Sequence, residues 1–397
     1  MKVLALSSGT SVDAIDVALA ELDDDAGTLA LTPLGHTEVP WPAELRERIL
    51  AALPPAEIGV GEWCRLDTLV GQTFAEAAAY GLERLGPADL IASHGQTLYH
   101  WVEEGRARGT LQVGAPAWIH ERTGVPVVHD LRSADVAAGG HGAPLVSLLD
   151  HLWLGERRTA ALNVGGIANI TVVGPAGQTA GARVVTGDTG PGNCLIDAAV
   201  ADLTGRPYDA GGELAAAGTV DGGALEVLLA DPFYRRELPR STGREHFHSR
   251  YVAERLGAAG LRLSGPDLVA TLTELTARTV ADQVRGAGVE RVVVSGGGAH
   301  NPVLMARLRD LLPPVVTATE LGLDGDAKEA YLFAVLGYLG VRALPGTAPR
   351  TTAEPDGPRA TGARHPAVLG SLTPPAPAPC APATAAVRRL VIVKEHP

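Results

Sequence analysis

The chain has 397 residues, too many for one small hydrophobic core, and this length predicts two domains. Hydrophobic residues make up 46% and aromatic residues only 4%, so the core must be built mainly from Ala, Val and Leu. The formal net charge of −12 argues against nucleic-acid backbones and anionic membrane surfaces as partners.

The positions of the lysines and cysteines argue against two kinds of site, a P-loop and a zinc site. Only Lys2, Lys328 and Lys394 are lysines, and none stands in the Gly-Lys-Ser/Thr context of a P-loop. The 3 cysteines are scattered, which fits a reducing compartment and offers no zinc spacing. The N-terminus turns polar after a few residues, and no later run approaches the roughly 20 apolar residues of a membrane span. We therefore expect a cytoplasmic protein.

Three apolar strands open the chain, at Lys2–Leu6, Ala14–Leu22 and Thr28–Val39. The first hairpin is rich in Gly, Ser and Thr, so it exposes backbone N–H and hydroxyl groups together. Apolar periodicity then predicts helices at Ala43–Leu53 and Gly61–Leu85.

Polar residues follow the next two strands. The strand Asp89–Ala92 is expected to deliver Ser93–Thr97, and the strand Val125–Val128 is followed by His129–Asp135. Two strand ends that carry polar groups predict a cleft along one edge of a sheet.

The pattern then begins again. A helix at Leu145–Leu154 leads into the strands Ala160–Val164 and Ile167–Val173, which are joined by Gly165 and Gly166. An apolar strand, a glycine tip and an apolar return also describe residues 5–19, so a duplicated module is indicated.

The stretch 183–197, RVVTGDTGPGNCLID, carries the principal candidate for catalysis. The strand Arg183–Thr186 delivers Asp188, and a turn of Gly and Pro leads into a helix that begins near Cys194. Backbone N–H groups at a helix start can hold an anion, so Asp188 would be a base beside a phosphate site. In the alternative, Asp188 only caps the backbone of its own turn.

The C-terminal part holds one more glycine-rich turn. The strand Arg291–Val294 feeds residues 295–301, SGGGAHN, where bare backbone lets a flat ligand approach. A helix follows to Leu312, and a second helix, opened by residues 326–329, runs to about Val341, after which Pro, Thr and Arg become frequent. From Thr373 the Ala- and Pro-rich sequence predicts a mobile tail without a catalytic role.

These features occur within nine motifs that stand in order between Val3 and Leu372: GTSVDAID, SHGQT, TLQVGAP, DLRSAD with AAGGHGAPLV, LNVGGIANIT, DTGPGN, STGRE, SGGGAHN and DAKEA. In order and spacing they resemble the anhydro-N-acetylmuramic acid kinases, within the sugar kinase, Hsp70 and actin superfamily. The first hairpin departs from the family's usual MSGTSLDGID, with a serine for Met and Ala14 for the second Gly. His141 stands where Gln is usual.

The resemblance implies an α/β fold of two tandem ribonuclease-H-like domains, as in actin, Hsp70 and sugar kinases, around a central cleft. The expected division is a first actin-like domain at 1–140, a second at 141–345, a family C-terminal segment at 346–372 and a low-complexity tail at 373–397.

The resemblance also implies a reaction. Members of this family open 1,6-anhydro-N-acetylmuramic acid with water and phosphorylate the freed O6 from ATP with Mg²⁺, in peptidoglycan recycling. A homodimer is expected, with no nucleic-acid or membrane partner. Two alternatives stay open: a plain sugar kinase in which Asp188 deprotonates a free hydroxyl, and a nucleotide-binding regulatory module without turnover.

The motifs assign roles residue by residue, with Asp188 as the general base. ATP would contact the two hairpins and the triple-glycine turn, at Gly9, Thr10, Ser11, Val12, Asp13, Ala14, Ile15, Asp16, Gly165, Gly166, Gly296, Gly297, Gly298 and Asn301. The sugar would contact His94, Gln96, Thr97, Asp130, Arg132, Asp135 and Glu329.

Several of these residues have a structural alternative. Asp13 or Asp16 would lie near Mg²⁺, or Asp16 only sets the register of the hairpin. Arg132 could hold the lactyl carboxylate, with the neighbouring aspartates as braces. His94 could be structural, and Glu329 could complete a helix cap.

Overall fold

The computed structural model describes residues 1–9, 11–175, 183–243, 245–351, 354, 356–375 and 386–393. The chain forms two compact units, the first from Met1–Trp153 together with Ala327–Pro397 and the second from Leu154–Asp326. This division differs from the expected boundaries after residues 140 and 345. The reason is helix α12 (Lys328–Val341), which is apolar on nearly all sides and packs on β1, β2 and β4 of the first unit.

The first unit is built on a sheet with the order β12-β6-β4-β1-β2-β3-β13, and β5 pairs with β4. Strands β1 to β3 are antiparallel neighbours, whereas β4 runs parallel to β1 and β6 parallel to β4. The strands are β1 (Lys2–Ser8), β2 (Ala14–Asp25), β3 (Thr28–Pro40), β4 (Leu90–Glu103), β5 (Arg106–Val113), β6 (Val127–His129), β12 (Ser371–Thr373) and β13 (Arg389–Ile392).

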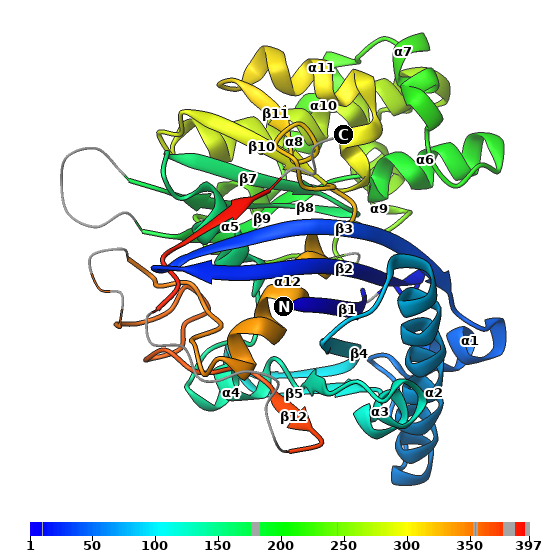
Figure 1. The fold of residues 1–397 in the computed structure, drawn as a ribbon. Coiled ribbons are helices and arrows are strands. Elements are labelled where there is room, and N and C mark those ends of the chain that lie inside the picture. Colours follow the sequence, from blue (N-terminus) through cyan, green and yellow to red (C-terminus); the bar gives the residue numbers. More distant parts are fainter. Residues whose placement is uncertain are drawn as a thin grey trace. The chain divides into compact units, whose positions relative to one another are not determined.

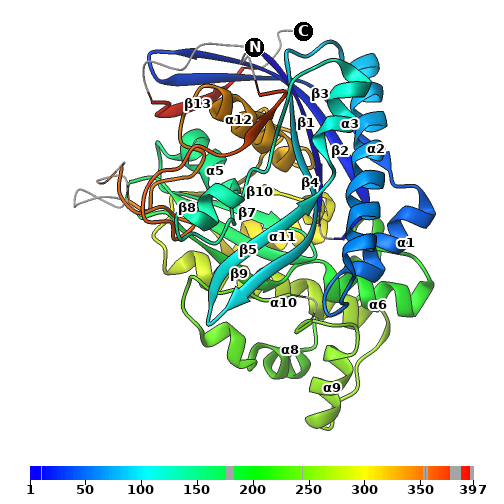
Figure 2. The same ribbon diagram turned by 90° about the horizontal axis from the view of Figure 1, so that it is seen from below.

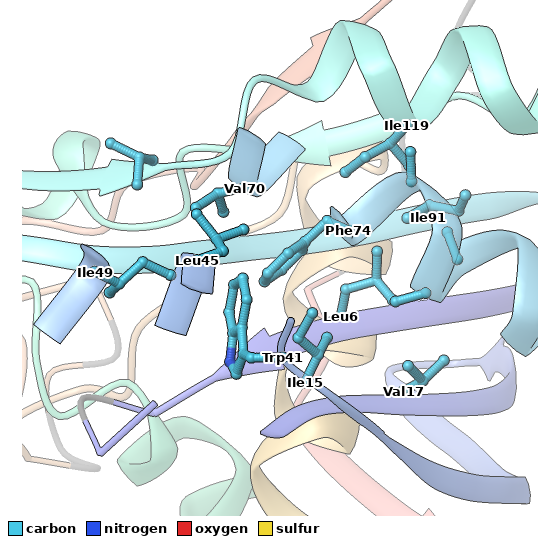
Figure 3. Close-up of a cluster of buried hydrophobic side chains, with 14 of the residues drawn as sticks. Leu6, Ile15, Val17, Trp41, Leu45, Ile49, Val70, Phe74, Ile91 and Ile119 are labelled. Carbon is cyan, nitrogen blue, oxygen red and sulfur yellow. The ribbon is translucent and has the colours of Figure 1, made fainter. Parts of the chain in front are cut away.

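Helices cover both faces of this sheet (Figure 1). The remaining helices of the unit are α1 (Ala43–Ala52), α2 (Val60–Leu85), α3 (Pro116–Thr123), α4 (Ser133–Ala137) and α5 (Val146–Leu154). On one face Gly81 of α2 lies against Leu4 and Val17, and on the other Gly337 of α12 lies against Ala92. Figure 3 shows the core under α2, where the rings of Trp41 and Phe74 are 5.7 Å apart.

The second unit has a five-stranded sheet with the order β11-β10-β7-β8-β9. Its strands are β7 (Thr159–Val164), β8 (Ile167–Val173), β9 (Val185–Pro191), β10 (Arg291–Ser295) and β11 (Val315–Thr317). Its α-helices are α6 (Cys194–Thr204), α7 (Glu213–Ala217), α8 (Gly222–Leu229), α9 (Tyr251–Ala258), α10 (Gly265–Arg285) and α11 (Pro302–Leu311). Short 3₁₀ turns lie at Ala210–Gly212, Pro232–Arg235 and Gly297–His300.

The two sheets share one topology. In each, three antiparallel strands are followed by two strands that lie parallel on the other side of the first, as in ribonuclease H. The predicted α/β class and the duplicated module are therefore confirmed.

Three local expectations were wrong. β4 does not end before Ser93 but continues to Glu103 and forms a long hairpin with β5 (Figure 2). Asp188 does not follow its strand but lies inside β9. Within the expected tail, Arg389–Ile392 is a strand that pairs in parallel with β3, so it is not detached.

Cys380 lies outside the described residues. Among the described helices, none has the length and apolar character to cross a membrane.

A buried ion pair joins two helices of the first unit. Lys328 Nζ at the start of α12 lies 2.6 Å from Asp150 Oδ1 on α5, and both residues are buried. Asp150 and Lys328 stand close to the two points at which the chain leaves and re-enters this unit. The pair therefore fixes both crossing segments to the same core.

Replacing one partner of this pair should destabilise the protein strongly. We predict that Lys328→Met leaves Asp150 buried without its cation and lowers the free energy of unfolding by about 3–5 kcal/mol. The thermal midpoint measures the effect, and Arg285→Met is the matched control. Arg285 pairs with Asp282 at 2.7 Å on the surface, where such a pair contributes less than about 1 kcal/mol. Equal shifts of the two variants would contradict the account.

Candidate active site

Asp188 is fixed by a loop more than 50 residues away in sequence. It lies on β9, an edge strand, opposite Asn169 of β8 at a register shift. Its N–H donates to the carbonyl of Arg240 at 2.9 Å, and its Oδ2 accepts from the N–H of Thr242 at 2.8 Å. Asp188 therefore does not cap its own turn, and that alternative is wrong.

Arg240 holds this loop against β9. Its side chain is buried, lies over the ring of Phe233 at 4.4 Å and donates to the carbonyls of Asp188 and Thr189 at 2.8 Å each. It also donates to three carbonyls within residues 233–236. The guanidinium thus binds backbone and forms no ion pair with the Asp188 carboxylate in the described part of the chain. Sequence reasoning missed Arg240, although the adjacent STGRE motif marked the loop.

The surroundings of Asp188 suit a base. The residue is half-buried, and burial raises the pKa of its carboxyl above the ordinary value, while hydrogen bonds from Thr242 N–H and the Ser241 hydroxyl oppose that rise. A carboxylate whose proton affinity is raised, yet which stays hydrogen-bonded, can accept a proton from a weakly acidic group.

The turn after Asp188 does not offer the anion site that the sequence predicts. The N–H groups of Gly192 and Cys194 donate to Gly166 O at 2.9 and 3.1 Å, and that of Asn193 donates to Gly165 O at 2.8 Å. A side chain at Gly192 would collide with the Gly165 carbonyl, which explains the glycine. The N–H groups of Gly165 and Gly166 have no backbone acceptor among the described residues, so they are the donors left for a phosphate.

The glycine-rich turn after β10 borders a cavity of the second unit. Gly296 has a φ of 81°, and a side chain there would meet Asn163. The cavity has a volume of about 240 Å³, and its lining comprises Val294, Gly296, Ala299, His300, Thr317, Thr319, Gly325 and Asp326. Asn301 lies outside this lining. Its Oδ1 accepts from the N–H groups of Val303 and Leu304, so it caps α11 and its predicted cofactor role is not supported.

The hairpin at residues 9–16 is shaped by its core contacts. Val12 has a φ of 55°, which is unusual for a β-branched residue. Val12 and Ile15 are fully buried, backbone included, so neither exposes an atom to a ligand. Arg46 Nε donates to Val12 O at 2.7 Å and holds the tip, whereas Ala14 begins β2 without positive φ and carries no strain. Thr10 lies outside the described residues.

Ser8 and two acids of this hairpin have clear partners. Ser8 is buried and its hydroxyl accepts from Trp41 Nε1 at 3.2 Å. Asp13 is exposed and pairs with Arg46 at 3.4 Å. Asp16 Oδ1 lies 3.2 Å from His36 Nε2, and one ligand atom each of Asp16, His36 and Glu38 lies within 4.8 Å of the others. The carboxylate oxygens of Asp16 and Glu38 are of the kind that Mg²⁺ binds, and Asp16 belongs to this group of side chains whereas Asp13 does not.

The predicted sugar-binding residues of β4 are partly committed to the fold. Gln96 is fully buried, and its Nε2 donates to Gly9 O at 3.3 Å, which ties β4 to the first hairpin. Its Oε1 is buried without a partner in the described residues. The hydroxyl of Thr97 accepts from Gln112 at 3.2 Å.

Arg132 is the centre of the other predicted sugar contacts. Its Nε lies 2.8 Å from His94 Nε2, and its Nη1 donates to Gly142 O at 2.6 Å. Asp135 is fully buried and accepts from Gly142 N–H at 2.8 Å and from the Thr361 hydroxyl at 2.6 Å, so it braces Arg132 through Gly142.

Asp130 and Glu329 differ in accessibility from Asp135. Asp130 is exposed, has a φ of 54° and accepts from Ser133 N–H at 3.3 Å at the start of α4. Glu329 is solvent-accessible, and no hydrogen bond from its side chain caps α12 in the described chain.

Comparisons with known proteins find similar sequences over nearly the whole chain. A family model described as anhydro-N-acetylmuramic acid kinase matches residues 1–375. Three proteins named anhydro-N-acetylmuramic acid kinase are similar to this chain. The one from Rhodococcus erythropolis is 52% identical over 94% of both chains, and the one from Streptomyces coelicolor is 51% identical over 94% of both. The one from Gloeobacter violaceus is 43% identical over 88% of this chain and 94% of its own.

Proposed function

Because this chain belongs to the anhydro-N-acetylmuramic acid kinase family and is a sugar kinase, we propose that it opens 1,6-anhydro-N-acetylmuramic acid with water and phosphorylates O6. The products are N-acetylmuramic acid 6-phosphate and ADP. The observation that carries this proposal is the Asp188 carboxylate, which is raised in pKa and has one oxygen engaged by Thr242 N–H.

In the proposed reaction Asp188 accepts a proton from a water molecule as the water oxygen bonds to the anomeric carbon. The bond from that carbon to O6 breaks, and O6 bonds to the γ-phosphorus of ATP while ADP leaves. A glycosidase needs a second carboxyl group to protonate its leaving oxygen. Here phosphorus captures that oxygen, so one carboxylate suffices.

The remaining residues supply binding groups. We propose that the N–H groups of Gly165 and Gly166 hold ATP phosphates, and that the cavity beside Gly296 holds adenosine. Asp16 is the carboxylate that would contact Mg²⁺, which neutralises phosphate charge when it is bound. Arg132 carries the positive charge for the sugar's lactyl carboxylate. A homodimer and a cytoplasmic location stay predictions from the sequence.

Purified protein tests this function directly. With ATP, 1,6-anhydro-N-acetylmuramic acid should yield ADP and the 6-phosphate, measured by coupled ADP release and mass spectrometry. N-acetylmuramic acid, which has a free O6, should be the poorer acceptor; the reverse preference would identify a plain sugar kinase. Asp188→Asn should lower kcat by about 10²- to 10⁴-fold, because it removes the base. Asp282→Asn, an exposed surface change, is the control.

A second prediction concerns pH. Ser241 donates a hydrogen bond to the charged form of Asp188 and thereby lowers the pKa of this carboxyl. Ser241→Ala removes that bond, so the pKa of Asp188 rises and the base is protonated at higher pH. The acid limb of the kcat/KM profile should therefore move to higher pH, with little loss of activity in alkaline buffer. A shift to lower pH, or an equal loss at every pH, contradicts the assignment.

A further inference from the structure

The contacts of His94 fix which ring nitrogen carries its proton. A guanidinium can only donate, so the 2.8 Å contact from Arg132 Nε requires an acceptor lone pair on His94 Nε2. The proton of a neutral ring must then be on Nδ1, which lies 2.9 Å from Gly95 O and donates to it. Both ring nitrogens are thereby engaged within the protein.

Packing supports a neutral ring. His94 is only 5% exposed and stacks on Phe333 of α12, with ring centroids 4.5 Å apart. Burial, together with the charge of Arg132, holds the pKa of His94 well below its usual value. His94 is therefore not a proton donor or acceptor for a substrate, and its predicted direct contact with the sugar is not what these hydrogen bonds support.

Arg132 is hydrogen-bonded by neutral groups and forms no direct ion pair in the described chain, while the nearby negative charges of Glu329 and Asp135 oppose the fall in its pKa that burial causes. His94 Nε2 accepts from its Nε and Gly142 O from its Nη1, whereas Nη2 has no acceptor among the described residues. Asp135 makes no direct hydrogen bond to it and acts through Gly142 N–H and through the charge of its carboxylate. A half-buried guanidinium that is oriented by neutral acceptors has donors left for an external anion.

We propose that His94 is a positioning residue: as a neutral Nδ1–H imidazole it orients Arg132 toward the carboxylate of an acidic amino sugar, and so selects such sugars over neutral ones. This inference rests on the proposed function for the identity of the sugar. The ring acts through Arg132 and makes no contact with the reacting atoms.

Matched substitutions at His94 test the role. His94→Leu keeps an apolar group against Phe333 but removes the acceptor, whereas His94→Gln can present an amide oxygen where Nε2 stands. His94→Leu should raise the KM for 1,6-anhydro-N-acetylmuramic acid about tenfold or more, as expected for a lost hydrogen bond to a charged group. Its kcat should change little. The KM for 1,6-anhydro-N-acetylglucosamine, which lacks the carboxylate, should stay the same, and His94→Gln should restore most of the selectivity. Equal effects on both sugars, or no rescue by Gln, overturn the proposal.

Two measurements on the wild-type chain are independent of turnover and of variant folding. Nitrogen-15 NMR of the histidine rings should show one ring that is protonated at Nδ1 and unprotonated at Nε2 in neutral and mildly acidic buffer; an imidazolium or an Nε2–H ring in place of it overturns the proposal. Calorimetric titration should show that N-acetylmuramic acid binds more tightly than N-acetylglucosamine, and equal affinities overturn it. If binding is selective but ATP is not consumed with either anhydro sugar, the proposed function fails while the role of His94 stands.

Discussion

The placement of Asp188 depends on the hydrogen bonds between β9 and the loop that contains Arg240. An edge strand has a free side, and here that side is occupied by the loop rather than by another strand. The side chain of Arg240 donates to five carbonyls, two of them on β9 itself. If the loop moved away from β9, this buried guanidinium would lose hydrogen-bond partners. This constraint keeps Thr242 N–H on the carboxylate and makes the side chain of Asp188 a fixed part of the second unit.

Arg132 in the first unit is held in a comparable way. It also donates to a backbone carbonyl, and its second fixed acceptor is an uncharged ring rather than a carboxylate. The two arginines differ in whether a side-chain donor is left without an acceptor. Arg240 uses its donors within the fold, whereas Nη2 of Arg132 has no acceptor among the described residues and is free for the anion that we propose. Lys328 differs from both arginines. Its compact ammonium is a point charge, and it is buried against the carboxylate of Asp150.

The sequence predicted the topology because apolar strands, glycine tips and helices recur in the same order in both halves. It failed where local residue type disagreed with tertiary pairing. Gly95 has positive φ within β4, and Gly190 and Pro191 belong to β9, where an edge position tolerates proline. Of the site, Asp188 and Arg132 were visible as charges in motifs. The sequence did not show that the N–H groups of residues 192–194 donate to the carbonyls of Gly165 and Gly166, because no local pattern shows which carbonyl a turn will meet. The same holds for the hydrogen bonds that Asn301 and Asp135 make within the fold, while their binding roles stay predictions.

The central claim is that a water molecule activated by Asp188 becomes the anomeric oxygen of the product. Turnover of 1,6-anhydro-N-acetylmuramic acid and ATP in heavy-oxygen water, sampled early and analysed by mass spectrometry, tests it most directly. Unlabelled 6-phosphate incubated without enzyme measures the spontaneous exchange of that oxygen. The account predicts one heavy oxygen on C1 at once and none in the phosphoryl group. Label that enters C1 no faster than in the exchange control, or that appears on phosphorus, would contradict it.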